Sequence, residues 1–346
     1  MLSINKKIID NKQKPYLIAE ISANHGGNID RAKDTILAAK NSGADAVKIQ
    51  TYTPDTMTIQ SDKSDFVIQD GIWSGYSLYD LYQEAHTPFE WHKELFDFAK
   101  SIDITIFSTP FDESAIDLLT ELETPAFKIA SFELIDLPLI KYAASKNKPM
   151  LMSTGMANHS EIADAIETCY RQNNRDILLF HCISSYPAEL TQSHLGDIQY
   201  LSKHFNVEVG LSDHTLSNMA AILSIALGAV AIEKHLKLKD LDTGPDSSFS
   251  ITPDQLKKLC EDCSIAHQAL QSNNLLRPIS EKGNKIFRRS IYFIKNLKKG
   301  HKINETDIKR IRPGYGLEPK YFDDILGKEL SCDVERGDPV SFDLLV

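Results

Sequence analysis

Short apolar runs rich in β-branched and aromatic residues alternate along the chain with longer segments in which apolar residues recur every three or four positions. The short runs predict buried strands, and the longer segments predict amphipathic helices. Eight runs fit strands, at residues 16–21, 46–50, 104–108, 126–129, 150–153, 177–182, 208–211 and 230–234. The helical spacing is clear in the segments 31–42, 90–101, 161–173, 219–227 and 253–270.

Eight strand–helix repeats within about 255 residues are typical of a TIM (β/α)8 barrel, an α/β fold. A doubly wound parallel sheet is the alternative, but it does not require eight repeats. No G-x-G-x-x-G turn follows the first predicted strand, as a dinucleotide-binding sheet of that kind would show. We therefore expect a barrel over residues 1–270.

The amino-acid composition changes after the last predicted helix. Residues 271–285 (QSNNLLRPISEKGNK) are polar and contain Pro278 and Gly283, which indicates a linker. Residues 286–346 hold short extended runs at 290–294 and 340–342 separated by turn residues, which predicts a small second domain. So small a domain has a small hydrophobic core and is expected to pack against another surface.

A long insertion, residues 51–88, separates the second predicted strand from the next helix. Long irregular segments in compact domains are usually functional or disordered, and this one is too rich in Tyr and Trp to suggest disorder. We interpret it as a lid.

Composition excludes several classes of protein. The net charge is −10 and no block of Lys and Arg stands out, which argues against a nucleic-acid partner. No stretch resembles a signal peptide or reaches the roughly 20 apolar residues of a membrane span, so we expect a cytoplasmic protein without a membrane partner. The five cysteines are odd in number and scattered, which favours reduced thiols.

Polar residues follow every predicted strand, where TIM-barrel enzymes place their active sites. Two lysines, Lys48 and Lys128, interrupt otherwise apolar strands, and a buried cation needs a compensating partner. One of them could form a Schiff base with a carbonyl substrate, each could simply pair with a carboxylate such as Glu20, or both could clamp a small anion. Nearby hydroxyl groups favour the anion clamp, those of Thr109, Ser131, Ser153 and Ser212.

Two histidines, His214 and His235, end consecutive strands and would meet at one rim of the barrel. Neutral imidazole is a common metal ligand, and two such groups suit Mn²⁺, Co²⁺, Fe²⁺ or Zn²⁺. Glu20 and Asp246 are the carboxylates available to complete the shell. No H-E-x-x-H motif of a zinc protease is present.

The ordered set of motifs resembles the sialic acid synthase family. The motifs are AEISANHGG (19–27), ADAVKIQTY (44–52), FSTPFD (107–112), FKIAS (127–131), MSTGM (152–156), HCISSYP (181–187), GLSDHT (210–215) and EKH (233–235). Residues 288–290 (RRS) and 311–316 (IRPGYG) resemble the family's C-terminal antifreeze-like (SAF, β-clip) domain, so the resemblance covers nearly the whole chain.

Two further segments resemble the pseudaminic acid synthase branch, IWSGYSLYDLYQEAHTPFEW (72–91) and GPDSSFS (244–250). The first lies in the predicted lid, where sugar specificity could be set. Ser184 stands where neuraminate synthases carry an asparagine after the sixth strand, which agrees with this branch.

The resemblance implies condensation of phosphoenolpyruvate (PEP) with 2,4-diacetamido-2,4,6-trideoxy-L-altrose, giving pseudaminic acid and phosphate with C–O cleavage of PEP. It assigns PEP to Lys48, Thr109, Lys128, Ser131, Ser153, Ser184 and Ser212. It assigns a divalent metal, foremost Mn²⁺ with Mg²⁺ or Co²⁺ as alternatives, to His214 and His235. Glu20 and Asp246 would act with these histidines in catalysis, and the sugar would contact Gln50, Glu133, Tyr186 and Arg312.

The resemblance also implies a domain-swapped homodimer, in which Arg312 of one subunit reaches the barrel of the other. Several alternatives stay open at this point: an N-acetylneuraminate or legionaminic acid synthase, a lysine Schiff-base aldolase, and a sugar-binding barrel without catalysis. Retention of both lysines, both histidines and Glu20 argues against the last.

Overall fold

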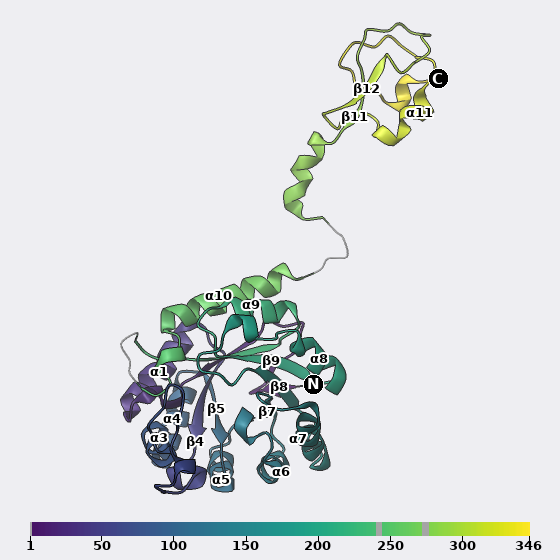
Figure 1. The fold of residues 1–346 in the computed structure, drawn as a ribbon. Helices are drawn as coiled ribbons and strands as arrows, with labels where there is room; N and C mark the ends of the chain where they lie inside the picture. Colours follow the sequence, from purple (N-terminus) through teal and green to yellow (C-terminus); the bar gives the residue numbers. More distant parts are fainter. Residues whose placement is uncertain (1, 240–243, 272–276) are drawn as a thin grey trace. The chain divides into compact units, whose positions relative to one another are not determined.

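The computed structural model describes residues 2–239, 244–271 and 277–346. Eight parallel strands close into a barrel in the order β10-β3-β4-β5-β6-β7-β8-β9, and helices surround them (Figure 1). The strands are β3 Tyr16–Glu20, β4 Ala46–Thr51, β5 Thr105–Pro110, β6 Phe127–Ile129, β7 Met150–Ser153, β8 Ile177–Cys182, β9 Glu208–Asp213 and β10 Ala231–His235. The predicted TIM barrel is confirmed, and each observed strand overlaps one of the predicted runs.

The main helices of the barrel are α1 Ile29–Ser42, α4 Phe89–Ser101, α5 Glu113–Glu121, α6 Leu137–Ser145, α7 His159–Arg171, α8 Asp197–Phe205, α9 Met219–Ala226 and α10 Pro253–Ala269. Five of them match the segments with clear helical spacing. The other three, α5, α6 and α8, have nine residues each and lie outside those segments. Local capping fixes where several helices begin. Asn158, for example, accepts hydrogen bonds from the backbone N–H groups of Ser160 and Glu161 at the start of α7.

Side chains of the strands divide between two apolar layers because successive residues point to opposite faces. On β3, Leu17 and Ala19 pack in the layer shared with the helices, whereas Tyr16 and Ile18 belong to a separate cluster that includes Phe107 and Phe180. Residues of an N-terminal hairpin, β1 (Ser3–Ile4) and β2 (Lys7–Ile8), with the residues that flank it, join this second cluster. The hairpin therefore closes the amino-terminal end of the barrel, and the polar residues collect at the opposite end.

The predicted insertion lies between β4, which ends at Thr51, and α4, which begins at Phe89. It contains α2 (Pro54–Met57), the 3-10 turn η2 (Ser64–Phe66) and α3 (Leu78–Ala85). A bridge between Val67 and Ser77 closes the loop between η2 and α3. The lid is therefore an ordered subdomain with short helices of its own.

Residues Ser272–Val346 form a second compact unit. Strand β11 (Ser290–Phe293) pairs antiparallel with β12 (Ile308–Ile311), and α11 (Phe322–Ile325) follows. Ile291, Phe293, Ile308 and Val340 belong to its own apolar core. This core rests on few side chains, as expected for a small domain.

Part of the predicted linker, 272–276, lies outside the described residues. Its later part includes the start of the 3-10 helix η6 (Ile279–Phe287), where Arg277 pairs with Glu281. The predicted extended run 340–342 needs correction. The N–H of Val340 donates to the carbonyl oxygen of Ile291 and its carbonyl oxygen accepts from the N–H of Leu317, but Phe342 begins the 3-10 turn η8 (Phe342–Leu344). Strand β12 escaped prediction because only Ile308 is fully buried in it.

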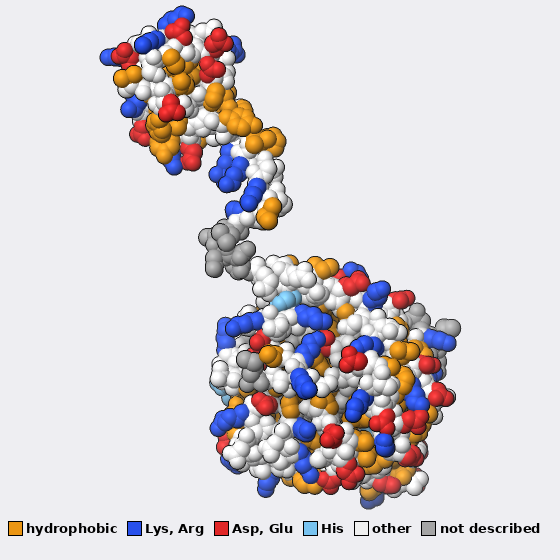
Figure 2. All heavy atoms as spheres, turned by 180° about the vertical axis from the view of Figure 1, so that it is seen from behind, with side chains coloured by type: hydrophobic (Ala, Val, Ile, Leu, Met, Phe, Trp, Pro, Cys, Tyr) orange, Lys and Arg blue, Asp and Glu red, His pale blue; other side chains and the backbone are white. Residues whose placement is uncertain are grey.

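Lys and Arg side chains alternate with Asp and Glu over the barrel face seen in Figure 2. Such a mixed surface favours solubility and lacks the single-sign field of a nucleic-acid binder on this face. Within the described ranges, no helix combines the length and the apolar composition that a membrane crossing requires.

Gly210 on β9 is required by close packing inside the barrel. A Cβ atom there would lie 2.7 Å from the carbonyl oxygen of Ala231 and 2.9 Å from the ring of Phe180. Gly210→Ala should therefore lower the free energy of unfolding by about 1–3 kcal/mol, measured by denaturant unfolding. Gly196→Ala is the matched control, because a Cβ there meets nothing within 4 Å. Equal stability of the two variants would contradict this packing.

His92 on α4 is fully buried and joins α4 to the base of the lid. Its Nδ1–H donates to the carbonyl oxygen of Pro88 (3.0 Å), and its Nε2 lies 2.7 Å from the hydroxyl of Thr51. Both ring nitrogens are thus satisfied in the neutral form. Burial lowers the pKa of His92 to about 4, below its ordinary value of 6.5.

This arrangement predicts a pH dependence of stability. The unfolded chain binds the proton of His92 more tightly than the folded chain, so the stabilisation is complete above pH 6.5 and is lost as the pH falls toward 4. The loss from this residue should reach at most about 3 kcal/mol. His92→Gln should flatten the curve of unfolding free energy against pH between 4 and 6.5. An unchanged slope would show that His92 does not titrate with folding.

Candidate active site

A cavity of about 420 Å³ opens at the carboxyl ends of the strands. Its lining includes most residues predicted for the site, namely Lys48, Gln50, Lys128, Ser131, Glu133, Ser153, Tyr186, Ser212, His214, His235 and Asp246. Two more, Glu20 and Thr109, bond to Lys48 just below. The volume is in the range of ordinary small-molecule sites.

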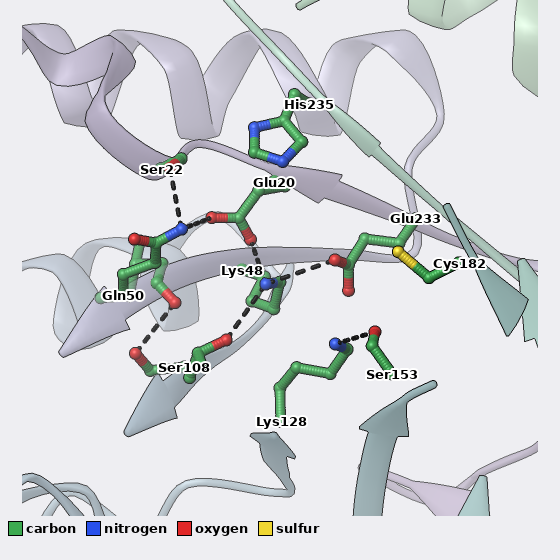
Figure 3. A network of polar contacts seen from close by, with 12 residues as sticks. Glu20, Ser22, Lys48, Gln50, Ser108, Lys128, Ser153, Cys182, Glu233 and His235 are labelled. Carbon is green, nitrogen blue, oxygen red and sulfur yellow. Dashed lines mark hydrogen bonds and ion pairs between the residues drawn. The ribbon is translucent and has the colours of Figure 1, made fainter. Parts of the chain in front are cut away.

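Lys48 is the centre of a buried polar network (Figure 3). Its Nζ lies 2.7 Å from Glu20 Oε2 and 3.3 Å from Glu233 Oε1, and it donates to the hydroxyl of Thr109 (3.1 Å). Burial alone would lower the pKa of Lys48, but the two carboxylates outweigh burial and raise it. Simple pairing with carboxylates, one of the three sequence hypotheses, thus describes Lys48.

Lys128 has a different environment. Its Nζ donates to the hydroxyl of Ser153 (2.6 Å) and contacts the carbonyl oxygen of Ile129 (3.2 Å). In the described part of the chain, no carboxylate lies within ion-pair distance of this ammonium group. Burial lowers the pKa of Lys128 despite the field of Glu233. Lys128 is therefore the lysine better placed to bind an incoming anion.

The pKa values of the two carboxyl groups beside Lys48 are shifted in opposite directions. Burial raises the pKa of Glu20 to about 7, although Lys48 opposes this shift. Burial also acts on Glu233, but the fields of Lys48 and Lys128 outweigh it and lower its pKa. The site can thus hold one ionised carboxylate at Glu233 and exchange a proton at Glu20 near neutral pH.

Gly155, in the turn after β7, packs against the hydroxyl groups of Ser131 and Ser184. A Cβ atom on Gly155 would lie 2.2 Å from Ser184 Oγ and 2.7 Å from Ser131 Oγ, so only glycine fits. The N–H of Gly155 also donates to Ser131 (3.2 Å). Ser184 was predicted as an anion ligand; it lies against this turn, 3.8 Å from Cys182 Sγ.

His214 and His235 lie together, with ring centroids 5.5 Å apart. Nδ1–H of His214 donates to the carbonyl oxygen of Ile183 (2.9 Å), which leaves its Nε2 with a free lone pair. His235 Nδ1 is buried without a hydrogen-bond partner and lies 3.8 Å from Asp246 Oδ2. Burial and the neighbouring His214 hold the pKa of His235 well below its usual value, so this imidazole is neutral.

This donor set fits a divalent metal chemically, with two imidazoles and the Asp246 carboxylate nearby. Burial would lower the pKa of His214, but Cys182 outweighs burial and raises it, so a metal bound there would displace a proton from this imidazole. Asp246 is itself held by the hydroxyl of Ser22. Across the described ranges, no three His, Cys, Asp or Glu side chains already converge as a complete metal site. A metal at these histidines would therefore need substrate or water as further ligands.

A second buried ion pair lies directly behind the histidines. Strands β9 and β10 pair Lys234 with Asp213, each one residue away from a histidine. Lys234 Nζ donates to Asp213 Oδ2 (2.6 Å) and to the carbonyl oxygens of Thr215 (2.6 Å) and Ser217 (3.0 Å). Because side chains alternate along a strand, this pair points away from the cavity and fixes the backbone that carries both histidines.

Three residues predicted to contact the sugar, Gln50, Glu133 and Tyr186, line the cavity. Glu133 Oε2 is buried without a hydrogen-bond partner, and burial raises the pKa of Glu133 to about 7. The ring of Tyr186 lies 4.4 Å from that of His214 and 5.7 Å from that of Trp73 in the lid. Gln50 donates to Ser22 (2.8 Å). Arg312 belongs to the second unit and follows β12, so its predicted role in the site stays a prediction.

Sequence reasoning missed three residues of the site. Glu233 and Cys182 line the cavity, as does Ser22. Burial would raise the pKa of Cys182, but His214 outweighs it and lowers that pKa to about 7. The strand-end residue His181, by contrast, faces away and bonds to the carbonyl oxygen of Ser193 (2.7 Å). The alternation of β8 was the available signal, since it sends His181 and Cys182 to opposite faces.

Comparisons with known proteins agree with this geometry. The model of the NeuB family matches residues 35–274, and that of the SAF domain matches residues 288–346. The pseudaminic acid synthase of Helicobacter pylori is 44% identical over 333 residues, covering 96% of this chain and 98% of that protein. The pseudaminic acid synthase of Campylobacter jejuni strain 81-176 is 42% identical, covering 94% and 95%.

Solved structures of related proteins have a similar fold. The spore coat polysaccharide biosynthesis protein SpsE of Bacillus subtilis is 30% identical with a TM-score of 0.67, covering 100% of this chain and 99% of that one. The N-acetylneuraminic acid synthetase of Leptospira borgpetersenii is 26% identical with a TM-score of 0.73, covering 82% and 94%. The chain therefore belongs to the NeuB family of sialic acid synthases and carries that family's SAF domain.

Proposed function

We propose that this protein is a pseudaminic acid synthase, which condenses PEP with 2,4-diacetamido-2,4,6-trideoxy-L-altrose to give pseudaminic acid and phosphate. The observation that carries the proposal is that Lys128, which has no carboxylate partner among the described residues, meets His214 and His235 in one cavity. Similarity over most of the chain to pseudaminic acid synthases supports this choice of sugar.

Lys128 and Ser153 would hold the phosphate of PEP, and the hydroxyls of Ser131, Ser184 and Ser212 would complete the shell. Lys48, with Thr109, would hold the carboxylate end while remaining paired with Glu233. His214 and His235 would bind a divalent metal, foremost Mn²⁺, which when bound polarises the aldehyde as a Lewis acid.

In this reaction C3 of PEP attacks the aldehyde carbon, water adds at C2, and phosphate leaves with its bridging oxygen. Water releases one proton as the aldehyde oxygen gains one. Glu20, with a pKa of about 7, is suited to carry that proton, with Asp246 beside His235 as the second carboxyl group. Gln50, Glu133 and Tyr186 would orient the sugar from the cavity wall.

The predicted domain-swapped homodimer belongs to the same proposal. It would bring Arg312 of the partner subunit's SAF domain to the cavity, where a guanidinium group could bind a polar group of the sugar. The second unit has a small apolar core, as expected for a domain that packs against another surface.

The direct test is phosphate release from PEP by the purified protein with Mn²⁺. We expect release with 2,4-diacetamido-2,4,6-trideoxy-L-altrose and little with N-acetylmannosamine or the stereoisomer that leads to legionaminic acid. His214→Ala should abolish turnover without loss of fold, whereas the exposed His204→Ala should keep it. Preference for N-acetylmannosamine would refute the proposed substrate, and no release with any acetamido sugar would refute the proposed enzyme.

The ion pair behind the histidines yields a separate prediction for metal binding. Asp213→Asn removes the charge that holds Lys234 while preserving shape, and loosened ligands should weaken Mn²⁺ binding about 10–100-fold. Isothermal titration measures this affinity without turnover. Asp262→Asn breaks a surface pair with Lys258 and serves as the matched control, expected to leave Mn²⁺ affinity unchanged. Equal affinities in both variants would show that the buried pair does not position the histidines.

A further inference from the structure

The lid contributes an apolar wall to the cavity. Of its side chains, Met57, Ile68, Leu78 and Leu81 line the cavity, with Phe111 and Phe132 continuing the wall from the barrel. Between residues 51 and 88 the sequence carries six acidic residues and Lys63, and in the described structure none of these seven lines the cavity. The lid thus turns its charged groups to solvent and its aliphatic groups inward.

The lid is anchored over the cavity. The indole N–H of Trp73 donates to the carbonyl oxygen of Pro245 (3.1 Å), beside Asp246 at the histidine side. The backbone N–H of Ile68 donates to the carbonyl oxygen of Tyr76, and the N–H of Gly75 donates to that of Ile68, both at 2.9 Å. Ile68 is therefore held by both its backbone groups while its side chain meets the cavity.

The cavity has two chemically different ends. Ammonium, carboxyl, hydroxyl and imidazole groups form its floor, at the ends of the strands, whereas the lid supplies aliphatic and aromatic groups. Under the proposed function, PEP occupies the floor and the aldehyde carbon must lie next to it. The end of the sugar remote from the aldehyde then extends toward the lid.

We propose that the apolar wall around Ile68, Leu78 and Leu81 is a subsite for the deoxygenated end of the sugar, and that it selects a C6 methyl group over a C6 hydroxymethyl group. This inference rests on the proposed function for the direction of the sugar. A methyl group against aliphatic side chains loses no hydrogen bond, whereas a hydroxyl group there gives up hydrogen bonds to water that Ile68, Leu78 and Leu81 cannot replace. An apolar pocket rejects an added hydroxyl by up to about 100-fold.

The test compares two sugars that differ by one oxygen atom, 2,4-diacetamido-2,4,6-trideoxy-L-altrose and its 6-hydroxy counterpart. Phosphate release from PEP gives kcat/KM for each. The unchanged protein should prefer the 6-deoxy sugar by about 10–100-fold. Ile68→Thr keeps the β-branched shape and adds a hydroxyl group, so it should reduce this ratio several-fold. Equal kcat/KM for the two sugars in the unchanged protein would overturn the proposal.

Ile59→Thr is the matched control, because Ile59 belongs to the same insertion, is 62% exposed and does not line the cavity. Its selectivity ratio should equal that of the unchanged protein. If Ile68→Thr fails to fold, as judged by thermal unfolding, Leu78→Gln tests the same wall. A ratio that stays unchanged in a folded wall variant would overturn the proposal.

Failure of the proposed function gives a different result. In that case neither sugar would support phosphate release, and quenching of tryptophan fluorescence by each sugar would replace kcat/KM as the measurement. Trp73 borders the cavity and reports binding without turnover. Tighter binding of the 6-deoxy sugar, weakened by Ile68→Thr, would support the apolar subsite, and equal binding of both sugars would overturn it.

Discussion

The ammonium group of Lys48 holds together the part of the barrel on which the site depends. It lies on β4 and reaches Glu20 on β3, Glu233 on β10 and Thr109 on β5. The pair β10–β3 is where the barrel closes, so one side chain bridges the first and last strands in sequence. Buried ion pairs add little net stability, but loss of one partner leaves a costly unpaired charge. Lys48 is therefore better understood as fixing the arrangement of the floor than as strengthening the fold.

This arrangement has a consequence for charge. Lys48 and Lys128 are opposed by Glu20 and Glu233, so these four groups supply no excess of positive charge to an anion carrying a phosphate and a carboxylate. Two sources of compensation remain, a proton on Glu20, whose pKa is about 7, and a divalent cation at His214 and His235. The floor thus links anion binding to proton uptake or to a metal, which a simple clamp of two lysines would not require.

Sequence alone was sufficient for the barrel because eight buried parallel strands leave eight apolar runs, and closure brings their ends to one rim. It was less reliable for side-chain direction. His181 and Cys182 are adjacent, and only the register of β8 decides that the thiol enters the cavity. Glu233 was visible in the EKH motif, but its pairing with Lys48 depends on which strands are neighbours. The short helices α5, with nine residues, and η6, a 3-10 helix of nine residues, were not among the predicted segments.

Floor and lid are subject to different constraints, and this difference bears on how specificity can change. Most floor residues lie in a barrel strand or in the turn that follows it, so a substitution there disturbs the barrel, as the close packing of Gly155 against Ser131 and Ser184 illustrates. The lid is a single insertion between β4 and α4, and most of its residues are partly or fully exposed. Its inward side chains can be exchanged without changing strand register. If the lid selects the sugar as proposed, a family that keeps one condensation reaction can vary the sugar by changing the lid without altering the residues of the floor.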